Sequence, residues 1–301
     1  MAEGEREEGG LRAGEVVGGR FRLRRLLGQG GYGSVWEAEG QDGRRLALKV
    51  EKERRRARPK PTLRMEALVL QRIPARVGPA FLGCGTLPRS GLGFLAMELV
   101  GPDLSALRRR SPHGRLAAPL VLSLAQESLE ALRDLHSVGF LHRDVKASNL
   151  ALRAGNRRCV LLDFGLSRQL GLWDGRARPE RRAVGFRGTR TYGSVRSLLR
   201  REQGRRDDLV ALLFVLLELI RGPLPWRQLR HNGELLAAKR LYPHLLSLLP
   251  GHVHLVGFQQ HLFELGCQDR PDYGFLGRCL LRFSVALLAA LHDHRRQPPP
   301  A

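Results

Sequence analysis

The pattern of the sequence changes at Gly101-Pro102, and this change restricts the fold more than any other feature of the chain. Four segments before it have the alternation or apolar character of strands: residues 21–28, 34–39, 44–51 and 93–100. One helix is expected among them, over residues 62–73, because apolar residues recur there at helical spacing. After residue 102 long amphipathic helices dominate. We therefore expect an α+β fold with two lobes, a small β-rich N-lobe and a larger, mostly helical C-lobe.

The amino-acid composition of the two ends of the chain indicates where the lobes begin and end. The first residues are acidic and without periodicity, and the last are rich in proline, so both ends are expected to be disordered. The predicted organisation is an acidic tail over 1–17, an N-lobe over 18–100, a C-lobe over 101–292 and a Pro-rich tail over 293–301.

The chain is strongly basic, but its charge alone does not identify a partner. It has 51 Lys and Arg against 29 Asp and Glu, a net charge of +22, and its few lysines are Lys49, Lys52, Lys60, Lys146 and Lys239. An excess made almost wholly of arginine can reflect a coding bias of the source. Because no aromatic residues are interleaved with it and no nucleic-acid motif is present, we expect no nucleic-acid partner.

The sequence also predicts a protein that works inside the cell, in the cytoplasm, the nucleus or both. The four cysteines form no CxxC pair and are expected to be reduced. Arginine runs such as residues 54–56 are weak nuclear signals. The longest apolar run, Leu209–Ile220, has twelve residues, whereas a bilayer needs about 20, so we expect a buried helix and no membrane partner.

A glycine cluster between the first two predicted strands fits the pattern G-x-G-x-x-G-x-V. Glycine allows backbone N–H groups to approach phosphate oxygens, although such a cluster alone is often only a turn. A strand follows it here, as in a flap over phosphates, rather than the helix of a dinucleotide site. The candidate nucleotide-binding residues of this segment are Leu27, Gly28, Gln29, Gly30, Gly31, Tyr32, Gly33, Ser34 and Val35.

Lys49 is the only lysine in a hydrophobic strand, sixteen residues after Gly33. A charge in such a strand needs an anionic partner, for which Glu66 in the predicted helix and a phosphate are the candidates. The alternative for Lys49 is an edge lysine whose amine reaches solvent, and for Glu66 a solvated charge on the helix face.

The segment Leu141–Leu150 has Asp144, Lys146 and Asn149 at positions i, i+2 and i+5, which suits a catalytic loop. Asp144 would accept a hydroxyl proton, Lys146 would neutralise phosphate charge, and Asn149 would bind a hard cation. Fourteen residues after Asn149, Asp163 ends an apolar strand before Phe164-Gly165, a suitable position for a Mg²⁺ ligand. Each motif alone would be weak, but together they stand in an order and at spacings that a phosphate-handling enzyme requires.

With these motifs in place, the chain resembles the eukaryotic protein kinases over residues 20–290. Several segments are similar to the casein kinase 1 superfamily: MELVGPDL at 97–104, GTRTYGS at 188–194, RRDDL at 205–209, RGPLPW at 221–226 and RPDY at 270–273. The segments 136–144 and 185–189 are most similar to the tau–tubulin kinase branch, whereas KASNL at 146–150 resembles vaccinia-related kinases.

The resemblance implies roles that the residues alone do not give. Met97 would stand behind the adenine of ATP, and the backbones of Glu98 and Val100 would bind it. Lys49, paired with Glu66, would hold the α- and β-phosphates. Asp144 would be the catalytic base, with Asn149 and Asp163 as Mg²⁺ ligands. Arg143 would brace the catalytic loop, and Asp208 would support it from the helix below.

The sequence departs from the casein kinase 1 pattern at the substrate side. The arginine that usually precedes the tyrosine of GTxRYAS is Thr191 here, with Arg190 one position earlier, and the usual alanine is Gly193. The glycine usual after RRDDL is Leu213, and the proline of K-P-x-N is Ala147. None of these changes removes a catalytic atom.

Residues 176–206 contain eleven arginines against Glu180 and Glu202, a local net charge of +9, from 11 minus 2. One interpretation is a solvated, coding-biased face. The other is attraction of acidic or already phosphorylated protein substrates.

The sequence thus predicts an ATP- and Mg²⁺-dependent serine/threonine kinase acting on proteins, with Lys146 as the residue typical of that specificity. The alternatives are a catalytically weak pseudokinase that acts as a scaffold and a basic nucleic-acid-associated module.

Overall fold

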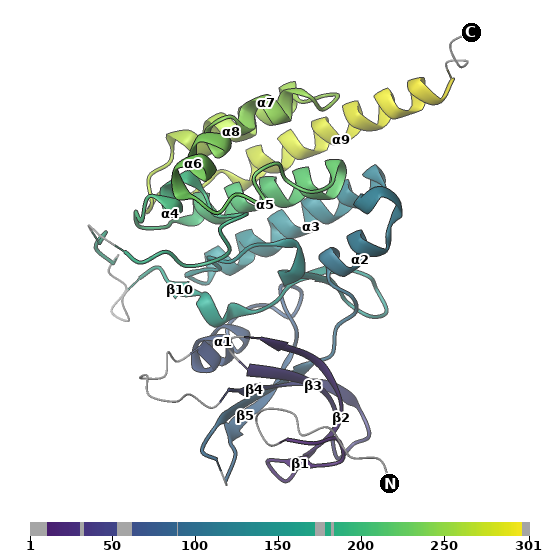
Figure 1. The fold of residues 1–301 in the computed structure, drawn as a ribbon, viewed down its shortest axis with the longest axis vertical. Helices are drawn as coiled ribbons and strands as arrows, with labels where there is room; N and C mark the ends of the chain where they lie inside the picture. The colour runs from purple at the N-terminus through teal and green to yellow at the C-terminus, as the bar shows by residue number, and fades with distance from the viewer. Residues whose placement is uncertain are drawn as a thin grey trace. The chain divides into compact units, whose positions relative to one another are not determined.

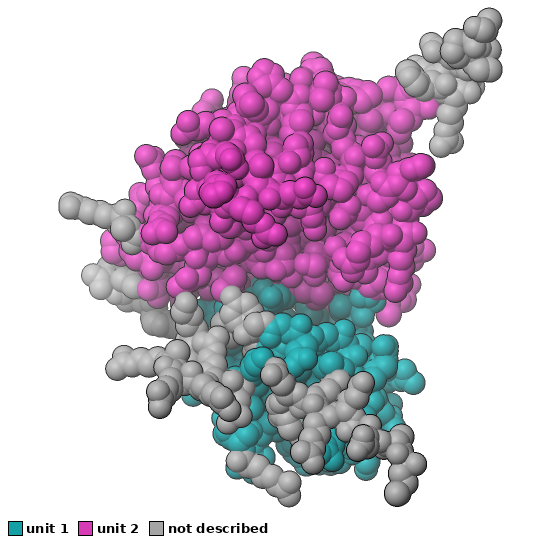
Figure 2. Space-filling view, in the orientation of Figure 1, with its two compact units in different colours: residues 1–101, 163–165 teal, residues 102–162, 166–301 magenta. Residues whose placement is uncertain are grey.

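The computed structural model describes residues 11–30, 33–52, 62–88, 90–171, 178–181 and 184–296. The chain divides into two compact units, shown in different colours in Figure 2: residues 1–101 with 163–165, and residues 102–162 with 166–301. The main division falls within Gly101-Pro102, where the sequence pattern changes.

The first unit is built on an antiparallel sheet with the strand order β1-β2-β3-β4-β6-β5 (Figure 1). Its strands are β1 (Val16–Val17), β2 (Phe21–Gly30), β3 (Gly33–Glu39), β4 (Arg45–Glu51), β5 (Phe81–Thr86) and β6 (Gly93–Glu98). β4 lies in the middle of this order, between β3 and β6, and its Leu46, Leu48 and Val50 are buried in the core. Apart from Ala47, these residues alternate with the charged Arg45, Lys49 and Glu51, which explains why this strand was predictable from the sequence.

Residues 11–17 correct the prediction of a disordered tail over 1–17. Val17 pairs with Phe21 across the β1–β2 turn and is 1% exposed, and Leu11 packs into the same hydrophobic core. The gain from burying these two apolar side chains outweighs the lack of periodicity around them. Residues 1–10 lie outside the described part of the chain.

The predicted helix forms but is shorter than expected. Helix α1 covers Thr62–Leu70 and gives way to a turn before Pro74, since a proline disfavours helical geometry in the residue before it. Strand β5 was not predicted from the sequence, because its segment FLGCGT contains two glycines that obscure the alternation.

The second unit is mostly helical. Its helices are α2 (Leu104–Arg110), α3 (Ala118–Ser137), α4 (Val195–Leu198), α5 (Arg205–Arg221), α6 (Asn232–Arg240), α7 (Tyr242–Ser247), α8 (Val253–Glu264) and α9 (Tyr273–Arg296). It also has two small two-stranded antiparallel sheets: β7 (Phe140–Leu141) with β10 (Arg168–Gln169), and β8 (Leu150–Leu152) with β9 (Cys159–Leu161). Short 3₁₀ turns lie at Pro112–Gly114, Ala147–Asn149 and Phe164–Leu166.

Helix α5 is the central element of this unit, and the prediction of a buried helix at Leu209–Ile220 is confirmed. Every residue from Arg206 to Leu219 is buried, and Leu213, where relatives usually have glycine, is 1% exposed. Trp226 packs edge-on against Phe214 of α5 and is itself buried, as a core anchor.

The last helix continues beyond the predicted limit of the C-lobe, since the backbone of α9 is helical to Arg296 rather than ending near residue 292. By length and composition alone, its segment Tyr273–His292 could cross a membrane. In this fold it runs against α3 and α8, and Leu276, Leu280 and Phe283 are buried there.

Candidate active site

The glycine cluster lies where β2 and β3 form a hairpin, and Gly31 and Tyr32 fall outside the described residues. Gly33 has φ +146°, and a Cβ there would lie 1.9 Å from the carbonyl oxygen of Val50, so the sheet itself requires this glycine. A Cβ on Gly28 or Gly30 would meet nothing within 4 Å. Those two glycines leave space that the surrounding protein does not use, which fits the close approach of a phosphate group to the backbone.

Lys49 lies in β4 and forms ion pairs with two carboxylates of the first unit. Its Nζ donates to Oε2 of Glu66, 2.7 Å away on α1, and to Oδ1 of Asp163 at 2.9 Å. The Glu66 side chain is 2% exposed. Burial by itself would lower the pKa of Lys49, but the charges of Glu66 and Asp163 outweigh it and raise the pKa above its usual value. The expected Lys49–Glu66 pair is present; the contact with Asp163 was not predicted.

Asp163 reaches Lys49 through an unusual backbone conformation, with φ +60°. The next residue, Phe164, is fully buried, and a Cβ on Gly78 would come within 3.1 Å of its ring. Such strain persists only where the surrounding packing enforces it, and here the buried ring fixes the carboxylate beside the amine.

The three residues expected at the adenine lie at the end of β6 and just beyond it. Met97 is buried, and Glu98 and Val100 are half-buried. The amide of Glu98 donates to the carbonyl of Ala80, 2.9 Å away. A contact between their backbones and a nucleotide stays a prediction.

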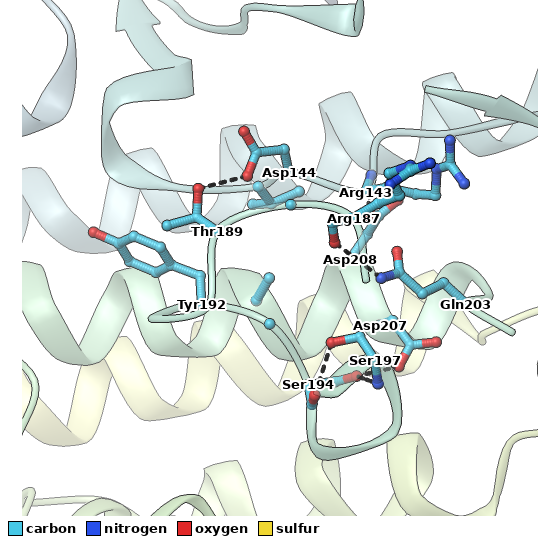
Figure 3. A pocket seen from close by; sticks show the side chains of 14 residues that line it. Arg143, Asp144, Arg187, Thr189, Tyr192, Ser194, Ser197, Gln203, Asp207 and Asp208 are labelled. Carbon is cyan, nitrogen blue, oxygen red and sulfur yellow. Dashed lines mark hydrogen bonds between the residues drawn. The ribbon is translucent and has the colours of Figure 1, made fainter. Parts of the chain in front are cut away.

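Asp144, in the second unit, accepts hydrogen bonds on both carboxylate oxygens. Thr189 Oγ1 donates to Oδ1 at 2.8 Å, the bond drawn in Figure 3. Lys146 Nζ donates to Oδ2 at 2.6 Å. Lys146 also lies 3.4 Å from Thr189 Oγ1. The carboxylate is buried, and its two oxygens point at the Thr189 hydroxyl and the Lys146 amine.

Asn149 is fixed by the same loop. Its Nδ2 donates to the backbone oxygen of Asp144 at 2.9 Å, with Oδ2 of that residue at 3.3 Å. The amide nitrogen is therefore turned toward Asp144, which directs the amide oxygen, the atom that binds hard cations, away from it. Within the described ranges, no group of three or more His, Cys, Asp or Glu side chains is arranged to hold a metal.

The catalytic loop is held from below by Asp208 of α5. Its carboxylate accepts from the backbone amides of His142 and Arg143, both at 2.8 Å, and from His136 Nε2 at 2.9 Å. Burial would raise the pKa of Asp208, but the hydrogen bond from His136 and these other contacts hold it below the ordinary value. Arg143 has φ +65° and donates from Nε to the carbonyl of Leu166, so it braces the segment that follows Asp163.

Thr189 is a residue beside Asp144 that the sequence reasoning did not single out. It comes 45 positions after Asp144, and the close approach depends on Gly188. Gly188 has φ +100°, and a Cβ there would lie 2.4 Å from the carbonyl of Arg143. The Gly-Thr pair of the GTRTYGS segment was the signal that could have identified it.

Lys239 of α6 is a second missed residue. Its side chain is fully buried, and Nζ donates to the carbonyls of Thr191, at 2.9 Å, and Gly193. Trp226 Nε1 also donates to Thr191, at 2.8 Å. Thr191 stands where the casein kinase 1 pattern has an arginine. Its backbone oxygen accepts the hydrogen bonds from both Lys239 and Trp226. Gly193 is explained by Phe186, whose ring would lie 3.2 Å from a Cβ at that position.

Several arginines of the basic segment, residues 176–206, have partners within the protein. Arg181 and Arg168 both pair with Glu202, at 2.7 and 3.0 Å, and Arg190 donates to Asn232 of α6. Arg187, Arg200 and Arg201 are exposed, whereas Arg176 and Arg182 lie outside the described residues. The positive charge available to a substrate is therefore smaller than the sequence count.

Comparison with known proteins decides the family. The chain matches the protein kinase domain over residues 21–248. It belongs to the protein kinase family. It is 37% identical over 276 residues to a probable serine/threonine-protein kinase of Dictyostelium discoideum, covering 89% of this chain and 54% of the relative. It therefore spans about half the length of that protein.

Two relatives from Caenorhabditis elegans are covered more fully. One, whose name assigns it provisionally to casein kinase I, is 34% identical over 76% of this chain and 68% of its own length. The other, the serine/threonine-protein kinase spe-6, is 31% identical over 87% of this chain and 71% of its own length. The two-lobed α+β architecture expected from the sequence is confirmed by this family membership.

Proposed function

We propose that this chain is an active serine/threonine protein kinase that transfers the γ-phosphoryl group of ATP to protein hydroxyls. The observation that carries the proposal is Asp144, which shares its two carboxylate oxygens between Lys146 and Thr189. A carboxylate beside a lysine is suited to take the proton of an attacking hydroxyl while the lysine neutralises phosphate charge.

Each residue has a distinct part in this chemistry. Lys49, oriented by Glu66, would hold the α- and β-phosphates, with Gly28 and Gly30 giving the backbone access to them. Asp144 would accept the substrate proton at a carboxylate oxygen as the hydroxyl oxygen attacks phosphorus. Asn149 and Asp163 would hold Mg²⁺, which when bound supplies charge neutralisation of the phosphates. Catalysis would then come mainly from positioning and electrostatic stabilisation.

We further propose membership of the casein kinase 1 superfamily, nearest the tau–tubulin kinase branch. The motifs at 97–104, 188–194 and 205–209 support it, as does the relative named after casein kinase I. An intracellular location, in the cytoplasm or nucleus, is part of the same proposal and is supported by the four free cysteines.

We also propose a preference for acidic or already phosphorylated substrates, which now depends on fewer arginines than the eleven counted in residues 176–206. Four arginines of the segment are exposed and have no carboxylate partner among the described residues: Arg187, Arg190, Arg200 and Arg201. Their attraction for phosphate would be screened by salt.

The pseudokinase alternative predicts a defect in the catalytic set. In the described residues Lys49, Glu66, Asp144, Asn149 and Asp163 all make contacts consistent with their proposed roles. This favours the active kinase over the scaffold.

The test is transfer of labelled phosphate from Mg·ATP to casein and to an acidic Ser/Thr peptide. Asp163→Asn and Asp144→Asn should each reduce transfer by at least about 10²-fold. Asp42→Asn, at an exposed turn carboxylate, is the matched control and should retain wild-type transfer. Equal background transfer by wild type and both variants, with all proteins folded, would refute the active kinase and favour the pseudokinase scaffold.

The substrate preference has its own test. Peptide phosphorylation should favour acidic or phosphorylated peptides and should fall steeply as salt rises. Kinetics that do not respond to salt and show no acidic preference would refute it, while leaving the kinase proposal intact.

A further inference from the structure

The second unit contains a pocket of about 540 Å³ that none of Asp144, Lys146, Asn149 and Thr189 lines. Four segments form it: the end of α3 with the turn after it, Leu170 and Gly171 after β10, the N-terminal residue of α5, and the loop that leads into α9. Its principal lining residues are Arg133, His136, Arg205, Arg270, Pro271 and Tyr273. This volume is in the range of sites that bind small molecules or single side chains.

The pocket is positively charged. Arg133, Arg205 and Arg270 line it, and none of its lining residues in the described part of the chain is an Asp or Glu. Arg205 Nη1 donates to the carbonyls of Gln268 and Asp269, at 2.9 and 3.3 Å, rather than to a carboxylate. Burial lowers the pKa of Arg205, and the charge of Arg270 lowers it further, so the two guanidinium groups are close enough to repel each other.

One of the three arginines has a carboxylate partner, whereas the carboxylates of two residues near the others accept from backbone amides. Asp134 pairs with Arg133 at 3.1 Å, Asp269 accepts from the amide of Gly266, and Asp272 accepts from the amide of Phe275 at the start of α9. Within the part of the chain that the structure describes, Arg270 has no ion pair, and its side chain lies at the exposed rim. The charge of the pocket is thus incompletely compensated by the protein, and a bound anion would lower the repulsion.

The floor of the pocket leads to the catalytic loop through hydrogen bonds. The Tyr273 hydroxyl bonds to His136 Nδ1, and His136 Nε2 lies 2.9 Å from Asp208. The Asp208 carboxylate can only accept a hydrogen bond, so His136 Nε2 carries the hydrogen. Burial lowers the pKa of His136 and favours its neutral ring. Nδ1 of that ring then accepts a hydrogen bond from the Tyr273 hydroxyl. Asp208 in turn receives the amides of His142 and Arg143.

An anion beside the three arginines would compete for the Tyr273 proton. If the phenolic hydrogen turned toward the anion, His136 would lose its donor at Nδ1, and the change would be transmitted to the Asp208 carboxylate that fixes His142 and Arg143. The pocket therefore has both a recognition surface and a physical connection to the catalytic machinery.

We propose that the arginine pocket formed by Arg133, Arg205, Arg270 and Tyr273 binds a phosphate monoester, and that its occupancy alters catalysis through Tyr273, His136 and Asp208. A phosphate monoester carries up to two negative charges and three acceptor oxygens, which suits a pocket lined by three arginines better than a single carboxylate does. The ester is that of a small molecule or of a phosphorylated side chain, and the two sources share this chemistry.

Binding is tested by isothermal titration calorimetry with glycerol 3-phosphate, a phosphoserine peptide and inorganic phosphate as separate probes. Arg270→Gln should weaken binding of at least one ester by about tenfold or more, because a charge-assisted hydrogen bond is lost. Arg240→Gln, at an exposed arginine of α6 outside the pocket, should leave binding unchanged. Tighter binding of the peptide would identify a phosphorylated protein as the source, and tighter binding of glycerol 3-phosphate a small molecule.

Absence of binding by all probes, or equal affinity of wild type and Arg270→Gln, would overturn the site. An additional variant, Arg181→Gln, separates this pocket from the arginines around Glu202: loss of binding in that variant alone would place the anion there and refute the proposal. These outcomes do not depend on kinase activity, so they are distinct from failure of the proposed function.

The connection is tested with Tyr273→Phe. This variant should bind the ester within about threefold of wild type, because the arginines remain. The ester should change the kcat for peptide phosphorylation in wild type but not in Tyr273→Phe. An identical response in both proteins, or no response in wild type despite binding, would refute the connection.

Discussion

Two buried lysines in this protein have opposite electrostatic environments. Lys49 in the first unit is paired with Glu66 and Asp163, and its pKa is raised. Lys239 in the second unit is 0% exposed, has no carboxylate partner among the described residues, and burial lowers its pKa to about 6. Its amine contacts two carbonyls and lies 4.6 Å from the centre of the Phe214 ring and 5.5 Å from that of Trp226.

The difference shows what each lysine is suited to do. A charged amine between two carboxylates keeps its charge at every physiological pH and can hold phosphate oxygens. An amine enclosed by carbonyls and aromatic rings is mostly neutral at pH 7 and serves as a donor that ties Thr191 and Gly193 to α6. We therefore expect substitution of Lys49 to affect chemistry and substitution of Lys239 to affect folding.

Lys49→Met should give the largest effect. It should lower kcat/KM for peptide phosphorylation by about 10³-fold, because a preorganised cation for the phosphates is lost. It should also lower the Tm, since Glu66 is left buried without its partner. The double variant Lys49→Met/Glu66→Gln should regain much of the Tm but none of the activity. Activity within about tenfold of wild type would contradict the assigned role.

Lys146→Met should come next, with a loss of about 10²-fold in kcat and little change in Tm. Lys146 is only 2.6 Å from Asp144 and touches Thr189, so its removal affects the transferred phosphate and the catalytic base together. Lys52→Met, at an exposed position after β4, is the matched control and should be as active as wild type. A variant that changed KM alone would show that Lys146 only binds substrate.

Lys239→Met should reduce the free energy of unfolding by about 1–3 kcal/mol at pH 7.5, because the Gly193 carbonyl loses its donor in the interior. Urea denaturation measures it, with Lys52→Met again as the control. Catalytic activity at a temperature where both proteins are folded should fall far less than in Lys49→Met. A stabilised Lys239→Met would mean that removal of a buried amine outweighs its two hydrogen bonds.

The pH dependence of stability should give the sharpest comparison between the two lysines. Between pH 6 and 9, Lys239 is largely neutral in the folded protein and protonated in the unfolded chain, so folding releases a proton and stability rises with pH. The stability of wild type relative to Lys239→Met should therefore increase by up to about 1.4 kcal/mol per pH unit. Lys49 has a raised pKa in the folded protein, so its contribution is complete below pH 10 and should show no such slope. A flat difference between wild type and Lys239→Met would contradict the lowered pKa.

Local sequence was sufficient for most of the catalytic set. Strand alternation placed Lys49 in β4, helical spacing placed Glu66 in α1, and the need to neutralise a charge in an apolar strand connected them. Asp144, Lys146 and Asn149 lie within six consecutive residues, so their proximity was fixed by the chain itself. Residues 11–17 were misassigned because a two-residue strand such as β1 leaves no periodic signal.

Contacts between distant segments were not predictable in this way. Thr189 meets Asp144 across 45 residues, and Lys239 meets Thr191 across 48. The pocket lined by Arg133, Arg205 and Arg270 joins four separate segments, and the sequence showed only a diffuse excess of arginine there. A count of charges cannot say which are used in ion pairs, and Glu202 illustrates this, since it pairs with both Arg168 and Arg181.

By itself, the sequence determined the family, the change from sheet to helix at residue 101 and the chemistry of the catalytic residues, because these depend on residue type and short-range spacing. The tertiary structure alone decided the states of the buried charges. It placed two carboxylates beside Lys49, none of the described ones beside Lys239, and three arginines around Tyr273. The reason is physical: the free energy of a charge depends on its solvation and on partners brought from elsewhere in the chain, and both exist only once the chain has folded.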